Sequence, residues 1–285
     1  MPFLLIFISL YLVWPQLVYS YDPDVSTWQE VPRSPTPNSD DRYVWVNASN
    51  RSRYYWKVFK EGHSIKATLY KEGISSSEKP PFTPQAEDFQ FTYPYASLKV
   101  DDGWLIGFNQ GEFGRALYWF DRSGQSRYKI SNHQVVAFFR SSDGILAIEG
   151  LAHLSSSGGS IIRLRKSKRW QAEKLTLLPE APYAGVQFRD GRLLLVLSAS
   201  LAEYSRKADR EVLKFYEKDG DWGGLYPTSV VLTDDQTKAY IGMRQFVAEY
   251  EFERRILRFL LPDVSFLNKL DAEDEQALLG GYGPP

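Results

Sequence analysis

The sequence contains no cysteine and only three histidines, and these shortages exclude several kinds of site. Without cysteine the chain can form no disulfide, no thiol nucleophile and no cysteine-bound metal centre. The histidines, His63, His133 and His153, lie far apart in the chain, so no multi-histidine metal site is expected. The glycine-rich stretches lack the phosphate-loop pattern. The sequence therefore predicts no metal site and leaves any cofactor unknown.

Neither sign of charge dominates the chain. Lys and Arg number 34 against 35 Asp and Glu, which gives a formal net charge of −1. Such a balance supplies no strong field to attract nucleic acid or an anionic membrane surface. The densest basic run, residues 163–169, is typical of the solvated tip of a hairpin. We therefore expect no nucleic-acid partner.

The N-terminus begins with an apolar run that lacks any charge. Residues 3–14 are followed by Pro15, and Val18 and Ser20 fit the −3 and −1 positions of a signal peptide cleaved after Ser20. No Lys or Arg precedes the run, because the first basic residue is Arg33. Two alternatives are an uncleaved membrane anchor, which is short for a span of ~20 residues, and a buried strand.

Export fits the absence of cysteine, because many bacterial envelope proteins of this size have no disulfides. The expected location is periplasmic or secreted. Membrane contact is expected only if residues 1–20 are retained as an anchor.

Aromatic residues are plentiful, at 15 % of the chain. Tyr, Phe and Trp favour half-buried pleated strands, so composition leans toward an all-β fold. Hydrophobic residues at 43 % and charged residues at 24 % are ordinary for a globular protein. A chain of 285 residues can fold as one barrel or propeller domain.

Four segments share an aspartate-led turn followed by an apolar run. Asp-Gly between two apolar runs is a strong hairpin signal, because glycine accepts the positive φ of tight turns. The anchoring aspartates are Asp102, Asp143, Asp190 and Asp235, spaced by 41, 47 and 45 residues. This spacing indicates an internal repeat.

Each turn is preceded by one apolar stretch and followed by a second hairpin-like pair. Four strands in each 40 to 45 residues are typical of β-propeller blades. A degenerate earlier copy combines an inner strand at Tyr43–Val46 with an outer hairpin at residues 54–70, which brings the expected number of blades to five. The alternative is a β-sandwich or barrel of ordinary hairpins.

The expected domain organisation follows from these patterns. Residues 1–20 form the signal peptide, 21–41 a linker, 42–262 the propeller, and 263–285 a short C-terminal helix and tail.

The repeat also predicts where a ligand would bind. If the aspartate-led turns join the first and second strands, the next connection lies on the opposite face, where propellers commonly bind ligands. The polar candidates in those connections are Asn109, Glu112, Arg115, Glu149, His153, Glu203 and Arg244. Glu149 and Arg244 directly follow apolar strands. A carboxylate there suits a general base or calcium ligand, and an arginine suits a carboxylate or phosphate clamp. Plain solvent exposure and ion pairs between blades are the alternatives.

Residues 226–250, YPTSVVLTDDQTKAYIGMRQFVAEY, resemble a blade of the bacterial β-propellers that include NHL-type repeats and SMP-30-like lactonases. The resemblance implies the fold and a stability compatible with export. It carries over no catalytic residue, because the Glu, Asn and Asp set of the lactonase metal site is not identifiable in this sequence.

The functional expectation is a binding module that holds a small-molecule ligand or a protein partner at the channel face. The alternative is a hydrolase of carbohydrates or lactones that uses carboxylates at the channel mouth. An enzyme of that kind needs two or three carboxylates in one pocket, whereas a scaffold needs an exposed aromatic or apolar patch.

Overall fold

The computed structural model describes residues 24–31, 54–69, 78–86, 95–154, 156–207, 210–220 and 222–262. Within these ranges the chain is almost entirely strand, and its helices are two 3-10 turns, η1 (Val25–Thr27) and η2 (Gly111–Phe113). No helix in these ranges is long and apolar enough to cross a membrane. The expected signal peptide, the strand at Tyr43–Val46 and the C-terminal helix lie outside the described residues.

Three sheets have four antiparallel strands each, in sequence order. The first contains β4 (Tyr95–Val100), β5 (Gly103–Asn109), β6 (Arg115–Asp121) and β7 (Arg127–Ser131). The second contains β8 (Val135–Ser141), β9 (Gly144–His153), β10 (Ser156–Lys166) and β11 (Trp170–Leu178). The third contains β12 (Pro182–Gln187), β13 (Leu193–Leu197), β14 (Leu201–Lys207) and β15 (Arg210–Glu217).

The two remaining sheets involve both ends of the described chain. One contains β16 (Ser229–Leu232), β17 (Lys238–Gly242), β18 (Val247–Glu251) and β19 (Ile256–Leu261), and β1 (Gln29–Val31) adds to its outer edge beside β19. The other is a hairpin of β2 (Trp56–Glu61) and β3 (Ser64–Leu69). Residues 24–31 thus fall within the expected linker and form η1 and β1 of the domain.

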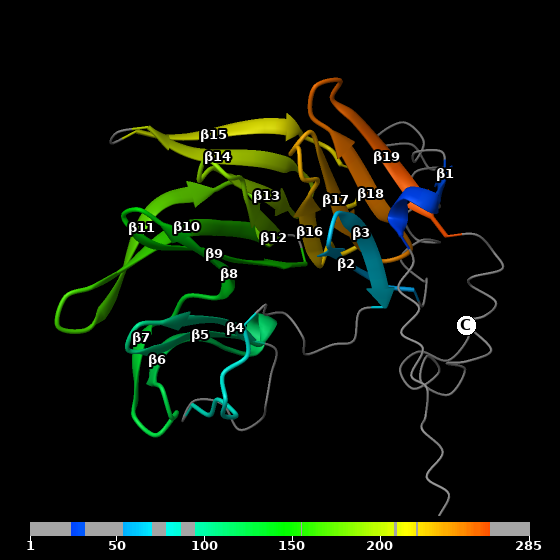
Figure 1. The fold of residues 1–285 in the computed structure, drawn as a ribbon. Coiled ribbons are helices and arrows are strands. Elements are labelled where there is room, and N and C mark those ends of the chain that lie inside the picture. The colour runs from blue at the N-terminus through cyan, green and yellow to red at the C-terminus, as the bar shows by residue number, and fades with distance from the viewer. Residues whose placement is uncertain are drawn as a thin grey trace, which may run out of the picture.

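The first strands of the sheets lie side by side around a common centre in the order β4, β8, β12, β16 and β2 (Figure 1). Successive four-stranded antiparallel sheets arranged in this way are the blades of a β-propeller. The fold is therefore all-β, as the repeat predicted.

The aspartate-led turns connect the strands that the repeat predicted. Asp102, Asp143, Asp190 and Asp235 lie between the first and second strands of their sheets. Gly191, with φ +88°, takes the left-handed conformation that an Asp-Gly turn requires. The fourth turn has no glycine, and Gln236 takes the left-handed conformation there with φ +59°.

The prediction for residues 54–70 was right about the hairpin and wrong about its place. We expected an outer pair of strands, but β2 packs beside β16 as an innermost strand. The Trp56 amide donates to the Met243 carbonyl at 3.0 Å, and the Val58 amide donates to Ser229 Oγ at 2.8 Å. The Trp56 side chain is 1 % exposed. A large aromatic side chain and alternating apolar residues suit the buried position better than an outer edge.

Apolar side chains between neighbouring sheets form the core. One cluster joins β4–β7 to β8–β11, a second joins β8–β11 to β12–β15, and a third joins β12–β15 to β16–β19. A fourth cluster joins the β2–β3 hairpin to the last sheet, and it includes Val25 and Trp28 from the N-terminal segment. Each blade is therefore stabilised chiefly by burial against the next one.

Candidate ligand-binding cavity

The innermost strands enclose a cavity of about 790 Å³. All five sheets contribute to its wall through β2, β4, β8, β12 and β16. Volumes of this size are common for small-molecule sites. The cavity therefore lies on the axis of the propeller, where residues from every blade meet.

A tyrosine marks the entrance of four of these five strands. All four lie within three residues of the first residue of their strands, and all four line the cavity, namely Tyr55 (β2), Tyr95 (β4), Tyr183 (β12) and Tyr226 (β16). The fifth strand, β8, is preceded by Gln134. Because the aspartate-led turns lie at the other end of these strands, the tyrosines gather on the face of the second-to-third-strand connections.

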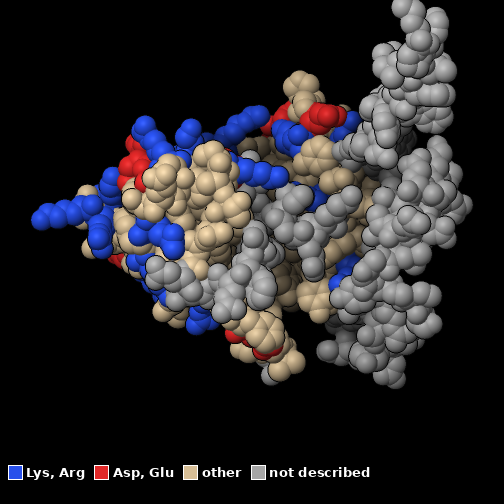
Figure 2. All heavy atoms as spheres, turned by 90° about the horizontal axis from the view of Figure 1, so that it is seen from below, with Lys and Arg blue, Asp and Glu red and all other residues tan. Residues whose placement is uncertain are grey.

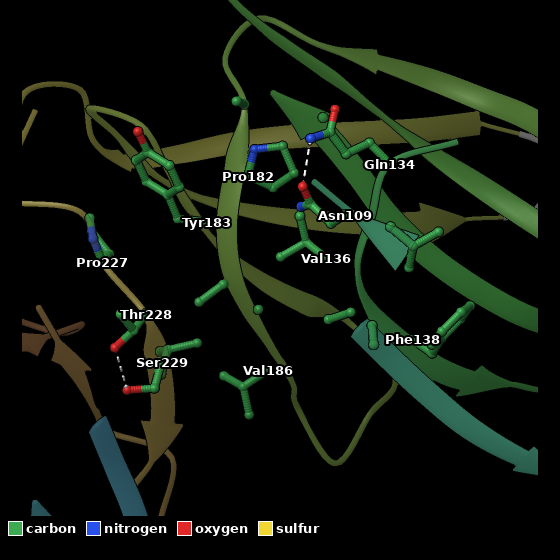
Figure 3. Close-up of a pocket in the computed structure, with 18 of the residues that line it drawn as sticks. Asn109, Gln134, Val136, Phe138, Pro182, Tyr183, Val186, Pro227, Thr228 and Ser229 are labelled. Atoms are coloured by element: carbon green, nitrogen blue, oxygen red, sulfur yellow. Dashed lines mark hydrogen bonds between the residues drawn. The ribbon is translucent and has the colours of Figure 1, made fainter. Parts of the chain in front are cut away.

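Gln134 supplies a buried hydrogen-bonding group at this end of the cavity. Its Nε2 donates to Asn109 Oδ1 at 2.6 Å and to the Gly111 carbonyl at 3.1 Å, which fixes the orientation of the amide. Figure 3 shows Gln134 and Asn109 joined in this way beside Pro182, with Tyr183 next along β12. Gln134 is 1 % exposed, and its Oε1 has no hydrogen-bond partner among the residues that the structure describes. A buried acceptor without a partner is rare in proteins, so a ligand donor is a natural complement.

Thr228 and Ser229 supply hydroxyl groups on the β16 side of the cavity (Figure 3). The Thr228 hydroxyl donates to the Trp56 carbonyl at 2.8 Å. Together with the bond from the Val58 amide to Ser229 Oγ, this contact ties β2 to β16. These hydroxyls therefore shape the wall while they hold two blades together.

Arg244, one of the predicted site residues, lies in the β17–β18 connection on the same face. Its guanidinium is 5.4 Å from the Tyr55 ring centre and 5.2 Å from the Tyr226 ring centre. The Tyr55 hydroxyl donates to the Tyr226 carbonyl at 2.7 Å. Cation–π contacts of this kind hold both rings in place. Arg244 thus positions the tyrosines, and it is not among the residues that line the central cavity.

Arg115, Glu149 and His153 meet in a second pocket of about 570 Å³. It adjoins the central cavity, because Gln134, Gly150 and Leu151 line both. Two further predicted residues stand next to this group. A Glu112 carboxylate oxygen lies 3.1 Å from His153 Nδ1, and Asn109 accepts the hydrogen bond from Gln134. Glu149 accepts a hydrogen bond from the Ser160 hydroxyl on the paired strand.

Glu203 lies elsewhere, contrary to the prediction. We expected it in a connection on the ligand face, but it belongs to β14 and faces the side of the aspartate-led turns. It is buried and pairs with Arg192, and it accepts a hydrogen bond from the Tyr216 hydroxyl. The reason is the short β13–β14 turn at residues 198–200, which places residue 203 well inside the following strand.

The titratable groups near the cavity are shifted toward their neutral forms. Burial raises the pKa of Tyr183, and proximity to Tyr226 adds to the effect. Burial, with a smaller contribution from Lys79, lowers the pKa of Lys57 on the opposite wall. Burial also lowers the pKa of His133 in the second pocket. These directions are typical of sites with a low dielectric constant.

Lys57 is the one charged residue among the described residues that line the central cavity, and neither Asp nor Glu is among them. In the described part of the chain no group of three or more His, Asp or Glu side chains could hold a metal ion. The wall combines apolar side chains with tyrosine, amide and hydroxyl groups. Chemically, it suits an uncharged ligand with an apolar face and hydrogen-bonding edges.

We expected ligand contacts in the connections after the second strands and not at the beginnings of the innermost strands. The sequence does contain a signal for these positions. A tyrosine precedes the anchoring aspartate by seven residues at Tyr95 and Tyr183 and by nine at Tyr226. A tyrosine seven to nine residues before the anchoring aspartate is the pattern that would have identified the rim.

Comparison with solved structures shows that this chain is similar in fold to several known proteins. The structure is similar to a chain of a nidogen/laminin complex, with a TM-score of 0.41, 10 % identity, and coverage of 62 % of this chain and 66 % of that one. It is also similar to virginiamycin B lyase from Staphylococcus aureus, with a TM-score of 0.41, 17 % identity, and coverage of 60 % and 56 %. A third similar structure is TolB from Acinetobacter baumannii, with a TM-score of 0.37, 12 % identity, and coverage of 57 % and 41 %.

This chain thus spans less than two thirds of the length of each of the three. All three are β-propeller proteins. No protein-family model matches the sequence, and a search of the curated proteins finds no match.

Proposed function

We propose that the protein is a binding module that holds an uncharged, hydroxyl-bearing ligand in its central cavity, with carbohydrate as the chemical class. The observation that carries the proposal is the cavity wall, to which the innermost strands of all five sheets contribute. The ligand would stack on the tyrosines at the strand entrances and donate a hydroxyl hydrogen to Gln134 Oε1. Sugar rings offer both an apolar face and hydroxyl donors.

The hydrolase alternative has less support. Glycoside hydrolysis of the usual kind needs two carboxyl groups that flank the scissile bond. The described lining of the central cavity includes none. In the second pocket Glu149 is bonded to Ser160, and the nearby Glu112 is paired with His153. These partners give both carboxylates a structural role.

A protein partner on the same face is the second candidate. Phe113 in η2 is 84 % exposed and Leu154 in the β9–β10 connection is 93 % exposed. The contact between Glu112 and His153, their neighbours in the chain, ties the two tips together. Exposed apolar side chains brought together on one face suit protein contact. Photo-crosslinking from a benzoylphenylalanine at position 113 in the exporting cell would show one discrete adduct if this candidate is right and none if it is wrong.

The proposal places the protein in the periplasm or outside the cell. Its support is the apolar run with Val18 and Ser20 at signal-peptide positions, and the absence of cysteine. Mass spectrometry of the exported chain tests this point, with an N-terminus at Tyr21 expected. A chain that retains residues 1–20 would favour an anchor.

The ligand proposal is tested by calorimetric titration of the protein with neutral sugars, namely glucose, maltose, cellobiose and N-acetylglucosamine disaccharide. At least one is expected to bind. Tyr226→Ala removes a half-exposed ring from the rim and is expected to weaken that binding about tenfold, the usual loss for one stacking contact.

Leu177→Ala is the matched control, because Leu177 is an exposed apolar residue of β11 away from the cavity. It should leave the affinity unchanged. The proposal is wrong if none of the sugars binds, or if Tyr226→Ala binds as tightly as the parent protein.

A further inference from the structure

A groove of about 1030 Å³ lies on the other side of the propeller, beside the aspartate-led turns of the β8–β11 and β12–β15 sheets. Its lining is rich in arginine, with two aspartates as the acidic residues. The arginines are Arg140, Arg163, Arg189, Arg192 and Arg206, and the aspartates are Asp143 and Asp190. The lining residues therefore include more arginines than aspartates. Two of these arginines are also paired with carboxylates just outside the lining, Arg163 with Glu173 and Arg192 with Glu203.

Asp143 fixes part of this arginine cluster. It forms ion pairs with Arg163 and Arg165 of its own sheet and with Arg206 of the next sheet, the last at 2.9 Å. Arg163 is only 7 % exposed and also pairs with Glu173 at 2.5 Å. These contacts hold guanidinium groups from two blades at fixed positions on the groove wall.

Other arginines on the wall have capacity left for a ligand. Arg189 forms no side-chain ion pair within the described residues. Arg140 donates to the Lys99 carbonyl at 2.7 Å and approaches Glu78 only to 3.7 Å. A guanidinium has five N–H donors, so one such contact leaves most of them available to a ligand or to water.

Tyr204 provides an independent sign of a ligand. It lines the groove and is 2 % exposed, yet in the described part of the chain its hydroxyl has no hydrogen-bond partner. Burial raises the pKa of Tyr204 to about 12, so the hydroxyl stays protonated at neutral pH. A buried hydroxyl without a partner costs stability unless something accepts its hydrogen.

Arg140, Arg189 and Tyr204 thus offer hydrogen-bond donors to the groove from two blades. We propose that this groove binds a tetrahedral oxyanion, a phosphate or sulfate group either free or on a small organic ester. Such a group has several acceptor oxygens that point in different directions, which matches donors on both sheets and the Tyr204 hydroxyl between them. A carboxylate offers two oxygens in one plane and fits this arrangement less well.

Calorimetric titration of the full chain with inorganic phosphate, inorganic sulfate and glycerol 3-phosphate, at constant ionic strength in chloride, tests the proposal. At least one of the three is expected to bind, and glycerol should not bind in the groove. Inorganic phosphate that binds as tightly as glycerol 3-phosphate identifies a free oxyanion as the ligand. Tighter binding of the ester identifies an organic phosphate. The proposal is wrong if none of the three anions binds.

Two substitutions test whether the anions bind in this groove. Tyr204→Phe removes the unpartnered hydroxyl and is expected to weaken binding about tenfold, as for one hydrogen bond to a charged group. Arg189→Ala should weaken it by a similar factor. The fold of Tyr204→Phe should be intact, because the hydroxyl has no partner to lose, and its urea midpoint should equal or exceed that of the parent.

Lys168→Ala is the charge-matched control. Lys168 stands at the tip between β10 and β11 and is not among the described residues that line the groove. Figure 2 shows many Lys and Arg side chains at one end of the molecule, so attraction by surface charge alone needs such a control. Affinity that falls equally in Lys168→Ala and Arg189→Ala would indicate unspecific attraction and would overturn the proposal. Binding of the anions to Tyr204→Phe as tightly as to the parent protein would overturn it as well.

Discussion

Single aspartates do more than form the turns in which they stand. Asp102 accepts hydrogen bonds from Lys166 at 2.8 Å and from the Trp170 indole at 3.2 Å, both in the following sheet. Asp143 pairs with Arg206 of the sheet after its own, and Asp234 pairs with Lys60 of the β2–β3 hairpin. These three turns thus connect their blades to the next one, which local turn chemistry alone does not reveal.

Asp143 makes these links dependent on pH. Hydrogen bonds from Arg165, and then from Arg163 and Arg206, lower the pKa of Asp143 from 3.8 to about 2. A carboxyl group whose pKa is lower in the folded state contributes stability above pH 3.8, and the contribution is lost as pH falls toward 2. Asp143→Asn should therefore lower the urea midpoint at pH 7, and the deficit should shrink between pH 4 and pH 2.

Urea unfolding of the parent protein and Asp143→Asn at pH 7, 4 and 3 checks this prediction. Asp101→Asn serves as the control, because Asp101 is exposed and forms no side-chain ion pair among the described residues. It should change the midpoint little at any pH. A deficit in Asp143→Asn that stays constant down to pH 3 would contradict the linkage.

At the scale of single elements, the contact between β2 and the last sheet depends on a glycine. A Cβ on Gly242 of β17 would lie 2.5 Å from the Trp56 carbonyl oxygen and 2.6 Å from Ser229 Oγ. It would therefore disturb the bond from the Val58 amide to Ser229. We expect Gly242→Ala to lower the free energy of unfolding by about 1–3 kcal/mol, the usual cost of overpacking.

Amide hydrogen exchange shows which strands Gly242→Ala destabilises. The amides of β2 and β3 should exchange faster in Gly242→Ala, while those of β12–β15 should change less. Gly158→Ala is the matched control, because a Cβ on Gly158 of β10 meets nothing within 4 Å. Protection lost evenly over all sheets would mean that the hairpin is not the element affected.

The strand order was predictable from the sequence where each repeat has local signals. Asp-Gly turns and alternating apolar residues place β4, β5, β8, β9, β12 and β13 correctly, because hairpin geometry depends on near neighbours. The position of β2 was not predictable in this way. Its partners, Ser229 and Met243, are more than 170 residues away, and only packing in three dimensions selects them.

The candidate site was likewise predictable where local signals decide a residue's position, and not where turn length or packing decides it. Of the residues predicted for one face, the structure brings Arg115, Glu149 and His153 together in one pocket. Glu149 was expected in the connection after its strand, but it lies inside β9, which continues to His153. The register misplaced Glu203, because the length of the β13–β14 turn decides that position. The central cavity itself needed the ring of inner strands, since its wall combines residues from five sheets.

At the scale of the whole molecule, the N-terminal segment stabilises the last blade. β1 pairs with β19 through Gln29 to Val31, and it covers an edge that would otherwise be open. Trp28 packs edge-on against Trp56, with ring centres 4.9 Å apart, and Val25 is fully buried. The segment thus touches both the last sheet and the β2–β3 hairpin, two blades that the chain visits at opposite ends of its course.

Two truncated chains test whether η1 and β1 stabilise the fold independently of residues 1–20. A chain that begins at Tyr21 keeps η1 and β1 and should unfold at the same temperature as any longer exported form. A chain that begins at Pro32 loses Val25 and Trp28 from the core, and we expect about 3 kcal/mol or more of stability to be lost with them. It also exposes the β19 edge, so sedimentation should show self-association. Equal unfolding temperatures for the two chains would show that β1 and η1 are not part of the folding unit.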